Sequence, residues 1–377
     1  MVPVRSKGLW SEALAMPDSP DAKQLGSAPG ELDPLVPRRL HDSYCEIMLP
    51  YGSNPELLEN YTNASGVIRT GLLMEHLDSL ARSIAYKHML GPDVSALPKN
   101  AGFYMVTASV DRLGMLASLY PVRDMRLSGQ VIHTGRSSLE VAVRVEALEK
   151  DGKEKTIMLA HSYCLPGRFC MVCRDARTHG SALVNPLSLE TAEDHILYTI
   201  GEVHKKKRQS RAVRSLNHVP PTSSEAEALH SLYLCTGRAR WASHVAGYLM
   251  RLAYELGFAN SCLFTRDHVT FLSFDGISFA RPVPLGSVLW LTSYIVHSSS
   301  SESYPALVHV CVHADVVNLE TGTEQRMNDF RFTRCRESGP PLSRMVVPKT
   351  YGEVMQWLVG GRAVEMGSEV RKLRKGP

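Results

Sequence analysis

Apolar residues recur at intervals of three and four between Gly71 and His88, which is the spacing of a helix with one broad apolar face. The positions that follow this rule are Leu72, Leu73, Leu77, Leu80, Ala81, Ile84 and Ala85. Asp78 lies among them. A short carboxylate is costly to bury unless it is hydrogen-bonded or has a function, so on an arbitrary helix Asp78 would most often be a solvated surface acid. It becomes a candidate functional residue only if other features of the chain support it.

The segments after this helix alternate apolar and polar residues, as half-buried strands do. We expect strands at 104–110, 125–133, 138–148, 156–161 and 169–174. The Asp-Gly step at 151–152 favours a hairpin turn, because these residues tolerate the positive φ of a tight turn. A sheet with the helix over one face is the simplest arrangement of these elements.

The order of elements repeats in the second half of the chain. Gly247 opens a second helical pattern, as Gly71 opens the first, and strand-like segments follow it. The step from Asp111 to Ser137 is 26 positions, and the step from Asp275 to Ser300 is 25. Such self-similarity predicts two like-ordered helix-plus-sheet units in tandem.

The two units differ at the position of Asp78. Counting from Gly71 and Gly247, the residue equivalent to Asp78 is Tyr254. Only the first unit therefore carries the acid. A duplicated site that keeps one chemistry would show this asymmetry, although divergence alone also produces it.

Composition divides the chain into five parts. Residues 1–40 are rich in Pro, Ser, Ala and Gly and are interpreted as a flexible leader, and 41–186 form the first unit. Residues 187–235 are interpreted as a basic linker and a polar helix; the basic run is either a solvated face or a contact for nucleotide phosphates. The second unit spans 236–336, and we expect it to lack its first strand because few residues precede its helix. Residues 337–377 are a tail with a short helix.

The overall composition is that of a globular protein, with 44% hydrophobic and 21% charged residues and a net charge of +4. So small a charge does not imply nucleic-acid binding, and no apolar run approaches the roughly twenty residues that cross a bilayer. The eight cysteines lie in apolar or mixed runs, as free thiols do. Cys170 and Cys173 form a Cys-x-x-Cys, but zinc needs further ligands at suitable spacing, so we expect a buried strand there and no metal site.

Several motifs occur in one order between residues 41 and 362. They include Asp42-Ser-Tyr, Leu77-Asp78-Ser-Leu, Gly135-Arg-Ser-Ser-Leu-Glu-Val, Gly247-Tyr-Leu-Met-Arg and Pro348-Lys-Thr-Tyr-Gly-Glu. In these motifs the chain resembles the mitochondrial acyl-CoA thioesterase family, whose members carry two hotdog units in one chain. The resemblance implies an α+β fold, a tandem (double) hotdog in which an antiparallel sheet wraps each central helix. It also implies hydrolysis of acyl-CoA to a free fatty acid and CoA.

The resemblance further implies a site between the two units, where a carboxylate on one central helix faces the start of the other. Asp78 is the matching carboxylate, as general base or as nucleophile. Thioester hydrolysis needs such a group together with donors for the developing oxyanion. The start of the second helix, at Ala246 and Gly247, can supply unpaired N–H groups. Ser137 and Ser138 are candidates to orient Asp78 or the water, or are ordinary surface turn residues.

On the same resemblance the substrate is acyl-CoA, and no separate cofactor is needed because coenzyme A is part of that substrate. Gly135 and Arg136, with the basic linker, are candidate contacts for the CoA phosphates. We expect a homo-oligomer. The resemblance favours a mitochondrial location, and a cytoplasmic one is the alternative because the targeting signal is weak.

The stretch before the second helix departs from the family. It reads Trp241-Ala-Ser-His244-Val-Ala-Gly247, without the family's Asn and with Ala in place of its first Gly. His244 is a candidate polar substitute or a structural residue. The departure keeps open a second hypothesis, a non-catalytic acyl-CoA-binding or degenerate hotdog protein. A hotdog hydratase ranks last, because it needs a His shortly after its Asp and Asp78 has none.

Overall fold

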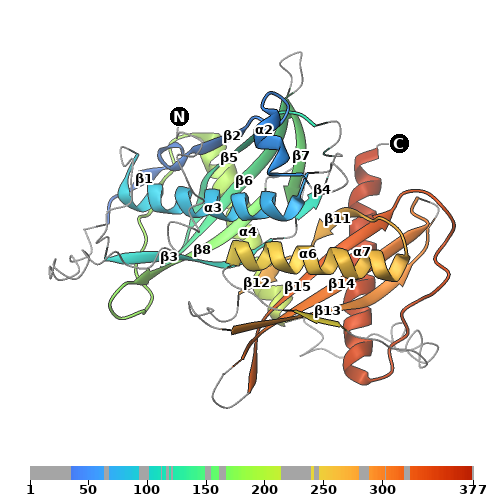
Figure 1. Cartoon of the computed structure of the whole chain (residues 1–377). Helices are drawn as coiled ribbons and strands as arrows, with labels where there is room; N and C mark the ends of the chain where they lie inside the picture. Colours follow the sequence, from blue (N-terminus) through green and yellow to red (C-terminus); the bar gives the residue numbers. More distant parts are fainter. Residues whose placement is uncertain are drawn as a thin grey trace, which may run out of the picture.

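The computed structural model describes most of the chain between residues 35 and 375. The described residues are 35–62, 68–92, 102–111, 113–115, 119, 122–148, 154–160, 167–213, 239–241, 246–279, 288–301, 303–317 and 323–375. Two long helices run across the middle of the molecule, each accompanied by strands of one half of the chain (Figure 1).

The first unit is a hotdog, a central helix wrapped by an antiparallel sheet. Its elements are β1 (Arg38–Arg39), η2 (His41–Ser43), β2 (Cys45–Leu49), α2 (Pro55–Glu59), α3 (Thr70–Leu90), β3 (Phe103–Val110), β4 (Leu113–Met115), β5 (Met125–Thr134), β6 (Ser138–Leu148), β7 (Glu154–Ala160) and β8 (Gly167–Asp175). The predicted helix and strands are confirmed. Asp78 is 3% exposed, so the solvated alternative for this acid is wrong.

The second unit repeats this plan. Its elements are β10 (Ala239–Trp241), α6 (Ala246–Thr265), β11 (Thr270–Phe274), β12 (Ile277–Ser278), β13 (Val288–Ser299), β14 (Ala306–Val317) and β15 (Glu324–Arg336). The first strand, which the sequence left little room for, is present but short. Three residues of β10 pair with β13, in the place that the five residues of β2 occupy on β5.

Both units belong to one 13-stranded sheet. They are joined by reciprocal pairs: Val110 at the end of β3 is in register with Ile277 of β12, and Leu113 of β4 is in register with Phe274 of β11. In the sequence repeat Val110 is equivalent to Phe274 and Leu113 to Ile277, so the two pairs are the same contact made in both directions. Reciprocal contacts of this kind indicate a local twofold relation between like units, and they confirm the tandem repeat.

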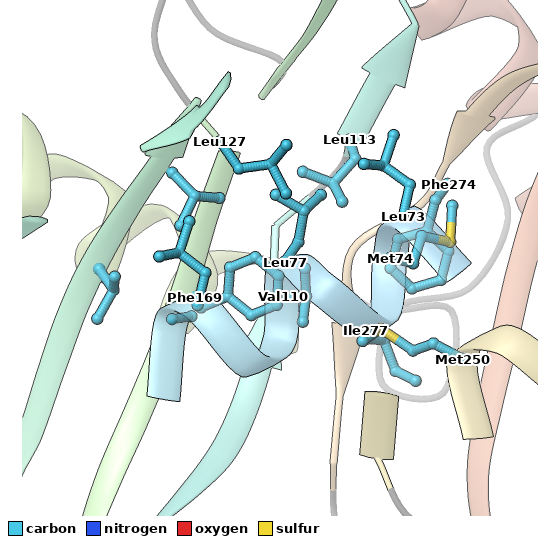
Figure 2. Packing of buried hydrophobic residues seen from close by; sticks show 14 of the residues in the cluster. Leu73, Met74, Leu77, Val110, Leu113, Leu127, Phe169, Met250, Phe274 and Ile277 are labelled. Carbon is cyan, nitrogen blue, oxygen red and sulfur yellow. The ribbon is translucent and has the colours of Figure 1, made fainter. Parts of the chain in front are cut away.

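The two central helices share one hydrophobic core. Leu73 and Met74 of α3 lie near Phe274 of the second unit, and Met250 of α6 lies near Ile277 (Figure 2). All of these side chains are at most 4% exposed. Burial of this size stabilises by roughly 1.5–3 kcal/mol for each large apolar side chain, so the interface between the units is an interior and not a loose contact.

A helix also covers the outer face of each unit. The helix α4 (Ala192–Val213), which follows the short β9 (Leu187–Ser188), packs on β5, and α7 (Tyr351–Lys375) packs on β13 and β14. Close approach requires a glycine in each helix. A Cβ added to Gly201 would lie 2.4 Å from His133, and one added to Gly360 would lie 2.7 Å from His297.

These outer helices correct two predictions. Residues 192–213 are a packed helix and not a linker, and the short C-terminal helix is 25 residues long. The basic run is also not simply solvated, because Arg208 pairs with Glu140 and with Asp111 beneath α4. The predicted polar helix near 224–234 lies outside the described residues. No described helix is long and apolar enough to span a membrane.

A polar cluster lies on β14 and β15 of the second unit. His313 Nδ1 is 2.6 Å from Asp329 Oδ1 and 3.8 Å from Cys311 Sγ. Arg326 and Arg331 flank the same carboxylate, at 3.3 and 3.6 Å. Although these three ligand types are close enough to share a metal ion, the arginines already balance the charge of Asp329, so the cluster is an ion-pair network.

The His313 ion pair should make stability depend on pH. Burial alone lowers the pKa of His313, but its hydrogen bonds to Asp329 and Cys311 outweigh this and raise the pKa to about 9 from 6.5. The charged pair therefore stabilises the fold fully below pH 6.5, and this contribution is lost as the pH rises to about 9. We expect thermal unfolding to show a loss on the order of 2 kcal/mol over this interval in the wild type and a flatter profile in His313→Gln. The exposed His195→Gln is the control; equal pH profiles for all three proteins would contradict the assignment.

Candidate active site

The acid of α3 lies against the start of α6. A Cβ added to Gly247 would lie 3.1 Å from Oδ2 and 3.2 Å from Cβ of Asp78. Gly247 is the second residue of α6, within the first turn, whose N–H groups have no acceptor inside the helix. Because glycine has no side chain, the carboxylate can approach this turn closely. The structure thus places Asp78 against Gly247, the residue after Ala246, as the family resemblance implied, although the roles of these residues stay predictions.

Two further residues hold the carboxylate. Thr107 of β3 donates its hydroxyl to Asp78 Oδ1 at 2.7 Å, and Arg82 donates Nη2 to Oδ2 at 3.1 Å. Each oxygen of the buried carboxylate therefore has its own donor. Oδ2, the oxygen closer to Gly247, is the one that Arg82 contacts.

Sequence reasoning missed both donors. Arg82 lies four residues after Asp78 on the same helix, a spacing at which side chains meet, so the pair was visible in the sequence. Thr107 carries no such signal, because its position beside Asp78 depends on how β3 packs against α3.

Ser137 and Ser138 do not lie beside Asp78. Thr107 is in register with Met171 of β8, which is in register with Leu139 of β6. This row faces α3, and side chains alternate along a strand, so Ser138 faces the opposite side of the sheet. Ser137 lies in the preceding turn, where its carbonyl accepts from Cys173. Thr107, and not Ser138, is the hydroxyl that contacts Asp78, and a role of either serine in orienting the water stays a prediction.

The turn at Gly135 and Arg136 forms a basic corner. Gly135 donates its N–H to the Ser138 carbonyl at 2.7 Å, and Arg136 is exposed. Lys205 of α4 comes to the same corner, since its Nζ would lie 3.4 Å from a Cβ on Gly135. Two cations at one corner suit an anionic group. His244 lies outside the described residues, and its role stays a prediction.

At the equivalent position, the start of α3, Arg251 of α6 lies against the glycine. A Cβ on Gly71, the second residue of α3, would lie 3.2 Å from Cγ of Arg251 and 3.4 Å from its backbone. Arg251 also pairs with Glu75 and Glu255. At the position of Asp78 stands Tyr254, whose ring lies 4.2 Å from the guanidinium of Arg334. The second position thus has a tyrosine where the first has Asp78. Its nearby acid on α6, Glu255, pairs with Arg69 and Arg251, and Arg251 covers the start of α3.

The Cys-x-x-Cys does not act as a unit. Cys170 and Cys173 are free cysteines on β8, and residues three apart on a strand point to opposite faces. Burial raises the pKa of Cys170 to about 11 and that of Cys173 to about 12. Both therefore remain protonated thiols at neutral pH, which are poor nucleophiles and poor metal ligands.

Comparison with known proteins places the chain among thioesterases. No protein-family model matches it. Human acyl-coenzyme A thioesterase 9, mitochondrial, is 33% identical to this chain, and the alignment covers 91% of this chain and 82% of the human protein. Mouse acyl-coenzyme A thioesterase 10, mitochondrial, is 31% identical, and the alignment covers 90% of this chain and 81% of the mouse protein.

Solved structures with weaker overall similarity carry related names. An apo-hexameric acyl-CoA thioesterase is 25% identical with a TM-score of 0.37, over 47% of this chain and 97% of that chain. An acyl-ACP thioesterase from Bacteroides thetaiotaomicron is 11% identical with a TM-score of 0.43, over 78% and 98%. The sequence identity to the human and mouse proteins, over nine-tenths of its length, shows that this chain belongs to the acyl-CoA thioesterase family that includes the mitochondrial thioesterases 9 and 10.

Proposed function

We propose that this protein hydrolyses fatty acyl-CoA to a free fatty acid and CoA at the junction of its two units. The observation that carries the proposal is the contact between the buried carboxylate of Asp78 and the glycine in the first turn of α6. One side of this junction offers a base or nucleophile and the other offers donors for an oxyanion. Family membership supplies the substrate class.

In one form of the reaction Asp78 acts as general base. It takes a proton from a water molecule, whose oxygen attacks the thioester carbonyl carbon. The carbonyl oxygen becomes an oxyanion that the N–H groups at Ala246 and Gly247 stabilise. Collapse breaks the carbon–sulfur bond, and the departing CoA thiolate receives the proton held by Asp78.

In the other form Asp78 acts as nucleophile. Its oxygen attacks the carbonyl carbon, the CoA thiolate leaves, and a mixed anhydride remains on Asp78. Water then cleaves the anhydride, which restores the carboxylate and releases the fatty acid. Both forms use the same carboxylate and the same helix start, and both give the same products.

The basic corner formed by Arg136 and Lys205 is our proposed contact for the CoA phosphates. Guanidinium and ammonium groups bind phosphate well, and an exposed arginine is free to reach a ligand. We further propose a mitochondrial location, on the names of the similar human and mouse proteins, and a homo-oligomeric state.

The first experiment is the release of free CoA by the purified wild type from acyl-CoAs of several chain lengths. We expect turnover, with a lower KM for acyl-CoA than for the matching acyl-pantetheine, which lacks the nucleotide phosphates. Binding of acyl-CoA with no turnover would instead select the non-catalytic acyl-CoA binder, which the altered stretch before Gly247 keeps open.

Removal of the Thr107 hydroxyl should slow the reaction. Thr107→Val keeps the shape of the side chain but loses the 2.7 Å hydrogen bond to Asp78. A hydrogen bond to a charged group contributes roughly 1.5–3 kcal/mol, so kcat should fall about tenfold or more. Thr107→Ser retains the hydroxyl and is the matched control. If the valine variant turned over as fast as the serine variant, Thr107 would have no part in holding the carboxylate.

A further inference from the structure

The arrangement of charges around Asp78 points to Arg82, which no comparison assigns a role. Its guanidinium Nη2 lies 3.1 Å from Asp78 Oδ2. Oδ2 is also the atom closest to a Cβ on Gly247, at 3.1 Å. Arg82 therefore contacts the same oxygen that faces the start of α6, where the proposed reaction takes place.

The carboxylate needs this contact because it is almost fully removed from water. The side chain of Asp78 is 5% exposed, and that of Arg82 is 18% exposed. A carboxylate in such a place loses its hydration, and the cost of this loss is offset by hydrogen bonds and by a counter-charge. Thr107 is a neutral donor and binds the other oxygen, so Arg82 is the cation in contact with Oδ2.

One hydrogen-bond donor of Arg82 is not used by the described residues. Its Nε is buried and has no hydrogen-bond partner among the described residues. Among the described side chains the guanidinium donates its hydrogen bond to Asp78. It also acts electrostatically on the Tyr86 phenol, where burial raises the pKa and the charge of Arg82 opposes that rise. The one hydrogen bond that Arg82 makes to a described side chain therefore goes to the proposed reacting group.

We propose that Arg82 is the positioning residue of this site: it binds the Asp78 carboxylate and holds Oδ2 toward the first turn of α6. This inference rests on the proposed thioesterase function. It adds a third component to the proposed site, the Arg82 guanidinium of α3, beside the Asp78 carboxylate and the first turn of α6. Arg82 acts through Asp78, so its loss should lower kcat and leave the binding of acyl-CoA largely unchanged.

The second unit offers a matched control. Arg251 on α6 is also paired with a carboxylate four residues away, Glu255, and its side chain is 22% exposed. It lies at the start of α3, where the residue equivalent to Asp78 is Tyr254. Arg82→Gln removes the ion pair with Asp78, whereas Arg251→Gln removes the ion pairs with Glu75 and Glu255 and leaves Asp78 untouched.

The test is steady-state CoA release by the wild type and by Arg82→Gln, Arg82→Lys and Arg251→Gln, with thermal unfolding of each. We expect kcat of Arg82→Gln to fall about a hundredfold with KM within about twofold, Arg82→Lys to recover part of the loss, and Arg251→Gln to keep wild-type kcat. Addition of millimolar guanidinium should partly restore folded Arg82→Ala, which a purely structural role would not allow.

The outcomes separate the inference from the function on which it rests. Wild-type kcat in Arg82→Gln, or an equal loss of kcat in Arg251→Gln, would overturn the role of Arg82 while leaving thioesterase activity in place. Absence of rescue by guanidinium in a folded Arg82→Ala would also count against it. A wild type that releases no CoA would remove both the inference and the proposed function.

Discussion

Asp78→Asn is expected to lower kcat for acyl-CoA hydrolysis by about a thousandfold, with little change in KM. Asparagine has the same size and can still accept the hydrogen bond from Thr107. It carries no negative charge, so it can neither take a proton from water nor attack a carbonyl. Release of free CoA under saturating substrate measures the effect.

Glu75→Gln is the matched control for this substitution. Glu75 is another buried carboxylate of α3, 3% exposed, and it pairs with Arg251 across the interface. Its loss should lower the unfolding temperature without lowering kcat. If Asp78→Asn kept more than about a tenth of the wild-type rate, the carboxylate would not be the reacting group in either form of the reaction.

Gly247→Ala is expected to lower kcat about a hundredfold. The new methyl group would lie 3.1 Å from Asp78 Oδ2 and 3.2 Å from its Cβ, closer than such atoms normally approach. The carboxylate must then move, and the methyl group takes space that the thioester carbonyl needs beside the helix N–H groups. The same CoA-release assay measures the change.

Gly71→Ala is the counterpart at the start of the other helix. Its methyl group would lie 3.2 Å from Arg251 and not against Asp78. Gly71 is nevertheless the residue equivalent to Gly247 in the repeat. We expect a loss of stability of similar size in both variants and a loss of kcat in Gly247→Ala alone. Equal effects on kcat would mean that the helix start of α6 has no special role.

The helix α3, the strands and the tandem repeat could be predicted because their signals are local. Periods of 3.6 and 2 residues and a matching spacing between the halves are properties of the sequence itself. The approach of Asp78 to Gly247 could be predicted only with the family resemblance, because no local pattern shows which helix start an acid will meet.

The errors arose where the answer depended on register or on polar packing. The residue of the sheet that lies beside Asp78 is set by the pairing of β3 with β8 and of β8 with β6, which the sequence does not reveal. The helix α4 was interpreted as a linker because it packs through Gly201, His204 and Arg208 and not through an apolar stripe. Charge was a poor guide there, since part of the basic run is paired beneath the helix.

The two units differ where they are equivalent in the repeat. Both units retain a glycine at the second residue of the central helix. In one unit that glycine faces an acid, whereas in the other it faces Arg251. The local twofold relation explains why a single chain has two such positions, and the difference between Asp78 and Tyr254 explains why we assign the reaction to one of them.

The most direct measurement is a crystal structure of the wild type with a non-hydrolysable thioether analogue of acyl-CoA that retains a carbonyl group. We expect the carbonyl carbon within about 3.5 Å of Asp78 or of a water bound to it, with its oxygen toward the N–H groups at Ala246 and Gly247. An analogue bound beside Gly71 and Tyr254, or away from both helix starts, would contradict the assignment of the reaction to this junction.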